Sequence, residues 1–310
     1  MDRKSELDIV RRAYAKQVMA AFGTDDRRVE KAFATVSRED FLGPGPWQIV
    51  RWNRGYVTTP RSDPVYLYDD VVVAILLERN LNNGQPSLHA WLIASAAPKA
   101  GEHVVHIGVG LGYYTAILSC LVSRRGKVTA IEYDPDLAVR SARNLADRRN
   151  VTVLNGDDTQ ADFAPADVIY VNAGATHPLP HWLDRLTEGG RLIVPLTDAG
   201  FPRGDIRHGA VFRTERRGDD YLARRVSAVA IFPCAGGRDA DGESALASAF
   251  LRGDGDDVTR LYAVTISLTP IVGCAARDGV WLMRDGTGNT TSTSRIIYIM
   301  ENNEATLHLP

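Results

Sequence analysis

The strongest constraint on the fold is a short segment near the middle of the chain, HVVHIGVGLGYY at residues 103–114. A mostly apolar run is followed at once by Gly108, Gly110 and Gly112, and then by a helix-like stretch. Glycines between a strand and a helix let the backbone approach a ligand, and the first N–H groups of a helix can bind one. The segment therefore predicts either a tight turn or a cofactor-binding loop, and the surrounding residues must decide.

The residues after this loop alternate between strand-like and helix-like patterns. We predict strands at 103–107, 127–133, 151–157, 166–173 and 189–196, and helices at 113–123, 135–149 and 179–186. Such alternation is typical of a parallel sheet with crossover helices. Residues 209–233 then read as antiparallel strands that close the sheet. The expected fold is an α/β Rossmann-like core, mostly parallel with an antiparallel edge.

Two further parts are expected around the core, which we place at residues 103–237. The N-terminal segment, residues 1–102, has apolar residues at helical spacing over 7–22 and 25–36, and then a loop rich in Pro, Gly and aromatics over 41–64. The C-terminal extension, residues 238–310, reads as a small α+β unit. It has a polar loop around a short helix at 237–257 and strands at 260–268, 279–283 and 294–300.

Composition excludes several classes of function. The 310 residues carry a formal net charge of -2, so bulk charge does not favour nucleic-acid binding. Cys120, Cys234 and Cys274 are far apart, which argues against a disulfide framework or a structural metal site. The N-terminus is charged throughout, and the apolar runs are too short to span a bilayer. We predict a cytoplasmic protein without a metal, membrane or nucleic-acid partner.

Acidic residues at strand ends favour a cofactor loop over a simple turn. Glu132 ends the second predicted strand, 20 residues after Gly112 (132 − 112 = 20), where a carboxylate can bind the ribose hydroxyls of an adenosine. Asp157 and Asp158 lie at the end of the next strand, at the same sheet edge, where an adenine amino group needs an acceptor. The last glycine of the dinucleotide pattern G-x-G-x-x-G is missing, because Tyr113 stands there.

The pattern present is G-x-G-x-G, with an acid on the second strand and Gly-Asp after the third. This pattern resembles S-adenosylmethionine (SAM) methyltransferases, which implies a SAM-dependent methyltransferase core. Asn172, near the end of another predicted strand, is assigned to the methionyl part of SAM. The cofactor-binding residues implied in this way are His106, Gly108, Gly110, Gly112, Glu132, Asp157, Asp158 and Asn172.

Several ordered motifs resemble the protein-L-isoaspartate O-methyltransferase family in particular. They are RRVEKAFATVSREDFL, YLYDD, NNGQPSLHA, HIGVGLGYYTA, APADVIYVNAGATHPLPHWLDRLTEGGRLIVPL and VAIFPCAGG, which together run from about residue 25 to 237. The resemblance implies a carboxyl O-methyltransferase that acts on aspartate or isoaspartate in a protein or peptide. It assigns residues 1–102 to substrate recognition and leaves residues 238–310 outside.

The segment NNGQPSLHA resembles the substrate segment of the family. The substrate-binding candidates are therefore Gly84, Gln85, Pro86, Ser87 and His89, with Ser87 either capping a helix or supplying a hydroxyl to the substrate. A carboxylate nucleophile is already anionic at pH 7, so no general base is needed and catalysis can rest on positioning. We accordingly expect no catalytic side chain.

Two residues depart from the pattern of the family. Gly84 stands where the family usually has a serine that helps recognise the isoaspartyl group, and His106 stands where it typically has an acid. Gly84 and the extension together resemble specialised members encoded with ribosomal peptide natural products (RiPPs), which methylate a normal aspartate whose ester cyclises to aspartimide or isoaspartate. His106 either bonds to the backbone or accepts a hydrogen bond from SAM or water. In the second case SAM affinity falls as pH drops through about 6.5.

Two other functions remain compatible with the residues. One is a small-molecule O- or N-methyltransferase on the same core, and the other is a SAM-binding or peptide-binding module without turnover. A methyl ester that hydrolyses at mildly alkaline pH distinguishes carboxyl chemistry from the first of these. SAM binding without methyl transfer to any peptide distinguishes the second.

Overall fold

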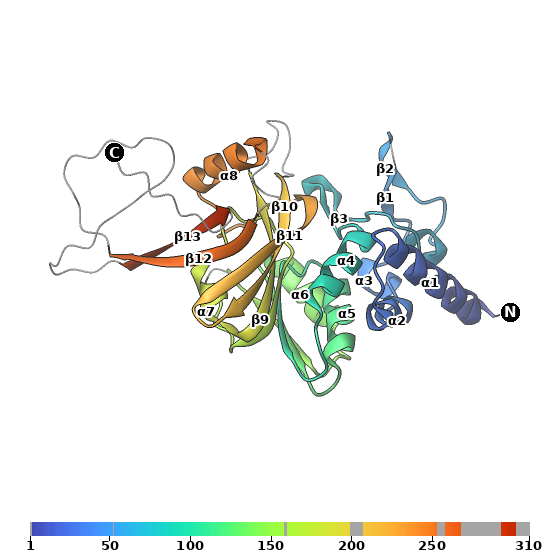
Figure 1. Ribbon diagram of the computed structural model, residues 1–310. Helices are drawn as coiled ribbons and strands as arrows, with labels where there is room; N and C mark the ends of the chain where they lie inside the picture. The colour runs from blue at the N-terminus through green and yellow to red at the C-terminus, as the bar shows by residue number, and fades with distance from the viewer. Residues whose placement is uncertain are drawn as a thin grey trace. The chain divides into compact units, whose positions relative to one another are not determined.

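The computed structural model describes residues 2–51, 53–157, 160–198, 207–252, 258–267 and 293–301. The chain divides into two compact units, Met1–Ala173 and Gly174–Pro310 (Figure 1). This division differs from the three parts expected from the sequence, with boundaries after residues 102 and 237. That partition stays a prediction.

The first unit opens with helices that form because their starts are capped and their apolar faces pack together. The Asp26 carboxylate accepts a hydrogen bond from the Arg28 amide at 2.8 Å, which caps the second helix. α1 packs against both α2 and α4. The predicted helices at 7–22 and 25–36 are confirmed. The helices of this part are α1 (Arg3–Ala20), α2 (Arg27–Thr35), α3 (Glu39–Leu42) and α4 (Pro86–Ala96).

The segment predicted as a loop over 41–64 contains a short antiparallel hairpin, so that prediction was wrong. β1 (Gln48–Arg51) pairs with β2 (Gly55–Thr58), and Asn53 turns the chain with a φ of 59°. Strands of four residues carry too little alternation to be recognised among prolines and glycines. The same part of the chain holds η1 (Pro64–Leu67), β3 (Ala74–Leu76), η2 (Leu77–Arg79) and β4 (Leu81–Asn82).

A parallel sheet with strand order β8-β5-β6-β7 forms the rest of the first unit. All five residues of its central strand are buried, as expected for a strand covered on both faces. The predicted strands at 103–107, 127–133, 151–157 and 166–173 and the helices after the first two are confirmed. These elements are β5 (His103–Ile107), α5 (Tyr113–Val122), β6 (Lys127–Glu132), α6 (Pro135–Asn144), β7 (Val151–Asn155) and β8 (Ala166–Val171).

The order of these strands reverses at β5. The chain adds β6 and β7 on one side of β5 and then returns to place β8 on the other side. In open α/β sheets, ligands bind outside the carboxyl ends of the strands at such a switch point. The glycine loop follows β5 directly, so it lies where this topology favours a ligand.

The second unit is built on antiparallel strands in the order β9-β10-β11-β12-β13. Its core includes Val194 and Phe212, which are register partners on β9 and β10 and are almost fully buried. The antiparallel strands and the short helix predicted here are confirmed, while the predicted strand at 279–283 lies outside the described residues. The elements are α7 (Pro180–Asp184), β9 (Leu186–Thr197), β10 (Arg207–Arg217), β11 (Asp220–Ile231), α8 (Ala240–Arg252), β12 (Val258–Ser267) and β13 (Thr293–Glu301).

Membrane and metal partners were not expected from the sequence. Among the helices in the described ranges, none combines the length and apolarity needed to cross a membrane. Across those same ranges no three His, Cys, Asp or Glu side chains gather in a way that suits a metal ion. A cytoplasmic location stays a prediction.

Candidate active site

The glycine loop after β5 adopts a backbone that side chains disfavour. Gly108, Gly110 and Gly112 have φ values of +75°, +59° and +94°. A Cβ on Gly108 would lie 2.9 Å from the carbonyl oxygen of Asn172, and one on Gly112 would lie 2.8 Å from a methyl group of Leu145. Both positions therefore require glycine for conformation and for space. Gly112 is also the residue from which α5 starts.

Glu132, the last residue of β6, holds this loop in place. One carboxylate oxygen accepts a hydrogen bond from the Gly110 amide at 2.7 Å, and the other accepts one from the Asp134 amide at 3.1 Å. Burial raises the pKa of Glu132, and these backbone amides oppose that rise. A carboxylate has roughly four lone-pair sites, so acceptor capacity remains for further donors such as a ribose diol.

The neighbouring strands bring the other predicted cofactor residues to the same edge. The Gly156 amide donates to the Glu132 carbonyl at 3.1 Å, which places the half-buried Asp157 just beyond the end of β7. The Asn172 amide nitrogen of the backbone donates to Ile107, and its side chain donates to the Gly108 carbonyl at 3.2 Å. The structure thus gathers the glycine loop, Glu132, Asp157 and Asn172, while Asp158 lies outside the described residues.

This set of residues fits an adenosine cofactor. A loop of three glycines brings bare backbone to the switch point, and a buried carboxylate with spare acceptor capacity stands beside it. The sheet with this loop and carboxylate defines the Rossmann-like class of nucleoside-binding folds.

The burial of His106 is at odds with the expectation that its ring titrates near pH 6.5. Its side chain is fully buried, and Nδ1 lies 2.8 Å from the hydroxyl of Thr115 on α5. Nε2 is enclosed and makes no hydrogen bond to a described residue. Burial lowers the pKa of His106 to about 3, so the ring does not titrate near pH 6.5. The ring is therefore a buried, neutral histidine bonded to a side chain rather than to the backbone, and its expected contact with SAM or a water stays a prediction.

The predicted substrate segment begins α4, and Asp70 organises its start. Asp70 accepts hydrogen bonds from the Ser87 amide at 2.8 Å, from the Ser87 hydroxyl at 2.6 Å and from the Gln85 side chain at 2.8 Å. Ser87 is fully buried, and its hydroxyl bonds to Asp70 and makes no capping bond to α4. Pro86 is buried as well. The substrate contacts expected of Gly84, Gln85, Pro86, Ser87 and His89 all stay predictions.

His89 lies at the centre of a group of aromatic side chains in the first unit. Its ring stacks on Tyr114 with centroids 3.6 Å apart, and its Nδ1 lies 2.8 Å from the Tyr170 hydroxyl. The Tyr114 hydroxyl donates to the carbonyl of Gly84 at 3.3 Å. Burial is the main reason that the pKa of His89 falls to about 3, so this ring is neutral too.

Arg38 is a buried cation that the sequence did not single out. It is fully buried and donates to the backbone carbonyls of Leu67, Asp69 and Val71 at 2.5, 3.3 and 2.6 Å. These bonds fix the segment that carries Asp70. Arg38 lies in the family-like motif SREDFL and Asp70 in YLYDD, which was the signal that could have identified them. Their spacing in the sequence does not predict which residues they bond to.

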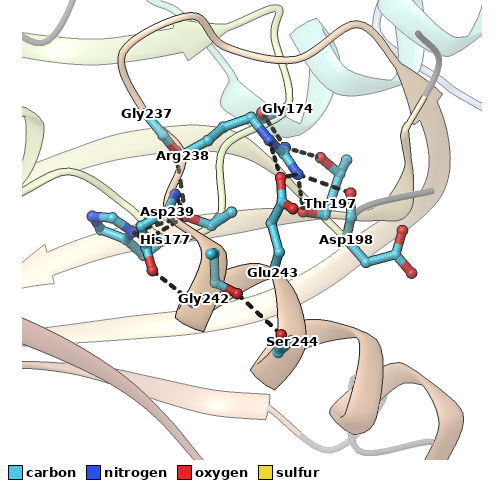
Figure 2. Close-up of polar contacts among 12 residues, drawn as sticks. Gly174, His177, Thr197, Asp198, Gly237, Arg238, Asp239, Gly242, Glu243 and Ser244 are labelled. Atoms are coloured by element: carbon cyan, nitrogen blue, oxygen red, sulfur yellow. Dashed lines mark hydrogen bonds and ion pairs between the residues drawn. The ribbon is translucent and has the colours of Figure 1, made fainter.

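A second polar centre lies wholly within the second unit, around Arg238 (Figure 2). Its guanidinium donates to the carbonyls of Gly174 and Asp198, both at 2.8 Å, to the Thr197 hydroxyl at 2.7 Å and to the Thr197 carbonyl at 3.2 Å. Its Nε donates to Glu243 on α8 at 2.8 Å. Arg238 therefore ties the start of α8 to the end of β9.

Asp239, the residue before α8, caps that helix. One carboxylate oxygen accepts from the Gly242 amide at 2.6 Å, and the other accepts from the Thr176 hydroxyl at 2.8 Å and lies 3.1 Å from the His177 ring (Figure 2). Thr176 and Asp239 both meet the same ring nitrogen, Nδ1 of His177. The arrangement is a helix cap rather than a nucleophile with a base.

Comparison with known proteins gives a family. The family model described as protein-L-isoaspartate(D-aspartate) O-methyltransferase (PCMT) matches residues 15–238. A protein-L-isoaspartate O-methyltransferase of Halorhodospira halophila is 30% identical over 230 residues, which cover 71% of this chain and 89% of the relative. One of Thermotoga maritima is 31% identical over 186 residues, 58% of this chain and 53% of the relative, so the match spans about half of that protein.

Solved structures agree with this result. A protein-L-isoaspartate O-methyltransferase with 27% identity aligns with a TM-score of 0.58 over 73% of this chain and 66% of its own. A Plasmodium falciparum protein described as a putative member, in complex with S-adenosyl-L-homocysteine, shares the fold at 17% identity. Its TM-score is 0.55 over 72% of this chain and 97% of its own. The chain belongs to the protein-L-isoaspartate(D-aspartate) O-methyltransferase family.

Proposed function

We propose that this protein is a SAM-dependent carboxyl O-methyltransferase that acts on aspartate or isoaspartate of a protein or peptide. The observation that carries the proposal is the buried Glu132, bonded to the Gly110 amide at a topological switch point in a chain of this family. Gly108, Gly110, Gly112 and Glu132 would hold the adenosine, with Asp157 and Asn172 beside them.

The proposed reaction needs little from the side chains except position. SAM supplies a methyl group on a sulfonium, and as the carboxylate oxygen forms its bond to that carbon the C–S bond breaks and sulfur keeps the electron pair. The carboxylate is already ionised at neutral pH, so no base has to remove a proton. His89 and His106 are held neutral by burial, which lowers the pKa of each to about 3. The proposed work of the chain is orientation and exclusion of water.

We further propose a specialised substrate, namely a normal aspartate in a constrained peptide of the RiPP kind. Its methyl ester cyclises to aspartimide when the following backbone amide nitrogen loses its proton and attacks the ester carbonyl, and methanol leaves. Gly84 supports this proposal, because the serine that the family usually has there would clash with His89 and would need a φ of +74°. Residues after 238, which lie beyond the match to the family model, support it as well.

The test is a methylation assay with SAM labelled in its methyl group. Two peptides that differ only in one aspartyl or isoaspartyl residue serve as substrates, and the label is followed through mild alkali. Alkali-labile label on either peptide supports the carboxyl reaction, and preference for the aspartyl peptide supports the specialised form. Rapid turnover of the isoaspartyl peptide alone refutes the specialised form. A stable methylated product, or binding of SAM without transfer, refutes the general proposal.

A further inference from the structure

The ring of His89 is held by two contacts within the first unit. It lies at the end of the first turn of α4 and is 3% exposed. One face of the ring stacks on Tyr114 at an interplanar angle of 13°, and Nδ1 bonds with the Tyr170 hydroxyl. A ring held in this way has one orientation, so the direction of its second nitrogen is also fixed.

That second nitrogen, Nε2, points at Gly84. A Cβ built on Gly84 would lie 2.3 Å from Nε2 and 2.9 Å from Cδ2 of His89. The imidazole edge therefore fills the space that a side chain at position 84 would need. Gly84 has a φ of +74°, which disfavours a side chain independently.

Nε2 of His89 is available for a hydrogen bond. Within the part of the chain that the structure describes, Nδ1 is the only ring nitrogen of His89 with a partner. Unlike Nε2 of His106, this atom is not among the enclosed polar atoms that lack a partner. A neutral imidazole has one N–H donor and one acceptor. When Tyr170 donates its hydroxyl proton to Nδ1, the proton of the ring stands on Nε2.

The electrostatic surroundings favour an anion beside this N–H. The guanidinium of Arg38 is fully buried. The pKa of His89 is lowered first by burial, then by His106, and then by the positive charge of Arg38, which is therefore close to the ring. The hydrogen bonds of this guanidinium to described residues go to neutral backbone carbonyls, and no ion pair joins it to a described carboxylate. Asp70 is the acidic group at the start of α4, and its oxygens are already bonded to Ser87 and Gln85.

We infer that His89 is a substrate-recognition residue, whose Nε2–H donates a hydrogen bond to one oxygen of the substrate carboxylate in the space beside Gly84. The other oxygen then stays unbonded for the methyl group. The inference rests on the proposed function, because it names the group that receives the carboxylate. It also makes Gly84 and His89 a reciprocal pair, in which a side chain at one position excludes the imidazole at the other.

The first experiment compares His89→Phe with the wild type. Phenylalanine keeps the stacking on Tyr114 and the filled space, but it has no N–H. With the peptide that the wild type methylates, we expect kcat/KM to fall about 10- to 100-fold, the range for a hydrogen bond to a charged group. SAM affinity by calorimetry should stay within about twofold, which also shows that the variant is folded. His181→Phe, outside the first unit, serves as the control and should change neither quantity.

The second experiment does not depend on turnover. The protein is labelled with ¹⁵N in its histidine rings, the His89 signal is assigned by its loss in His89→Phe, and each peptide of the assay is added with S-adenosylhomocysteine. A shift of the Nε2 signal with a carboxyl-bearing peptide, absent with the matching asparagine peptide, supports the inference. No shift with either carboxyl peptide overturns it. Failure of the wild type to methylate any peptide would refute the proposed function, and the shift of the Nε2 signal would still decide whether His89 binds a carboxylate.

A third measurement tests the reciprocal pair. Gly84→Ala and His89→Ala are made singly and together, and the thermal midpoint of each is recorded. Because the alanine at 84 meets the imidazole, we expect Gly84→Ala to lower the midpoint less in the His89→Ala background than in the wild type. Additive shifts would show that the two residues do not share space.

Discussion

The carboxyl edge of the parallel sheet and the region around Arg238 are both dense in polar contacts, but they differ in what those contacts leave over. At the sheet edge, Glu132 bonds two amides through separate oxygens and retains acceptor capacity, and Nε2 of His89 has no partner in the described chain. At Arg238 the donors of the guanidinium all meet acceptors of the second unit. Reserve capacity is typical of a binding site, and full satisfaction is typical of a structural one.

The largest expected effect is on stability, at the satisfied centre. Arg238→Met should lower the free energy of unfolding by roughly 2–4 kcal/mol, because several acceptors and Glu243 lose their donor at once. Urea unfolding measures this, and the dissociation constant of SAM should stay within about twofold. The exposed Arg217, which pairs with Glu215, provides the control as Arg217→Met, with an expected cost below about 1 kcal/mol. If Arg238→Met weakened SAM binding by as much free energy as it lost in unfolding, the distinction between a structural centre and a binding edge would be wrong.

The next effect is on binding, at the sheet edge. Glu132→Gln keeps the shape of the side chain and removes its charge, so bonds from the loop amide and from a ribose weaken together. We expect the dissociation constant of SAM to rise about 10- to 100-fold by calorimetry. Asp136→Asn, an exposed acid at the start of α6, is the matched control and should leave it unchanged. Unaltered affinity in Glu132→Gln would show that the carboxylate only supports the loop.

The smallest effect is on the pH dependence of stability. Burial lowers the pKa of His106 to about 3 in the folded state, against about 6.5 when unfolded. The unfolded state therefore binds more protons than the folded state between these two pH values. The free energy of unfolding is highest above pH 6.5 and falls as the pH is lowered towards 3. Between pH 6.5 and 5, His106→Asn should lose about 1.5 kcal/mol less than the wild type in urea titrations. Parallel curves for the two proteins would show that His106 does not titrate in this way.

Local pattern predicted much of the fold because the information was local. The apolar run of β5, the glycines after it and Glu132 at the end of β6 follow from spacing along the chain, and the switch point places them together. The hairpin of β1 and β2 was missed because each strand is only four residues long. Boundaries also differed, since α6 ends at Asn144 rather than near residue 149.

Long-range contacts were the part of the site that spacing could not supply. Ser87 bonds to Asp70, 17 residues away, and His89 bonds to Tyr170, 81 residues away. The helix-capping alternative for Ser87 was wrong for this reason, because its hydroxyl bonds to Asp70 in another segment. The steric conflict between a side chain at position 84 and the imidazole of His89 depends on a positive φ and on a ring orientation. Neither can be predicted from local sequence patterns.

The bonds of Arg238 bear on how the chain can be shortened. The match to the family model ends at this residue, which invites removal of everything after it. Yet a chain that stops there would lose Glu243 and the α8 helix that Asp239 caps, and one that stops at 237 would lose the guanidinium that bonds Thr197 and Asp198. A truncated protein for expression or crystallisation should therefore be cut after Arg252, at the end of α8, so that this anchor remains whole.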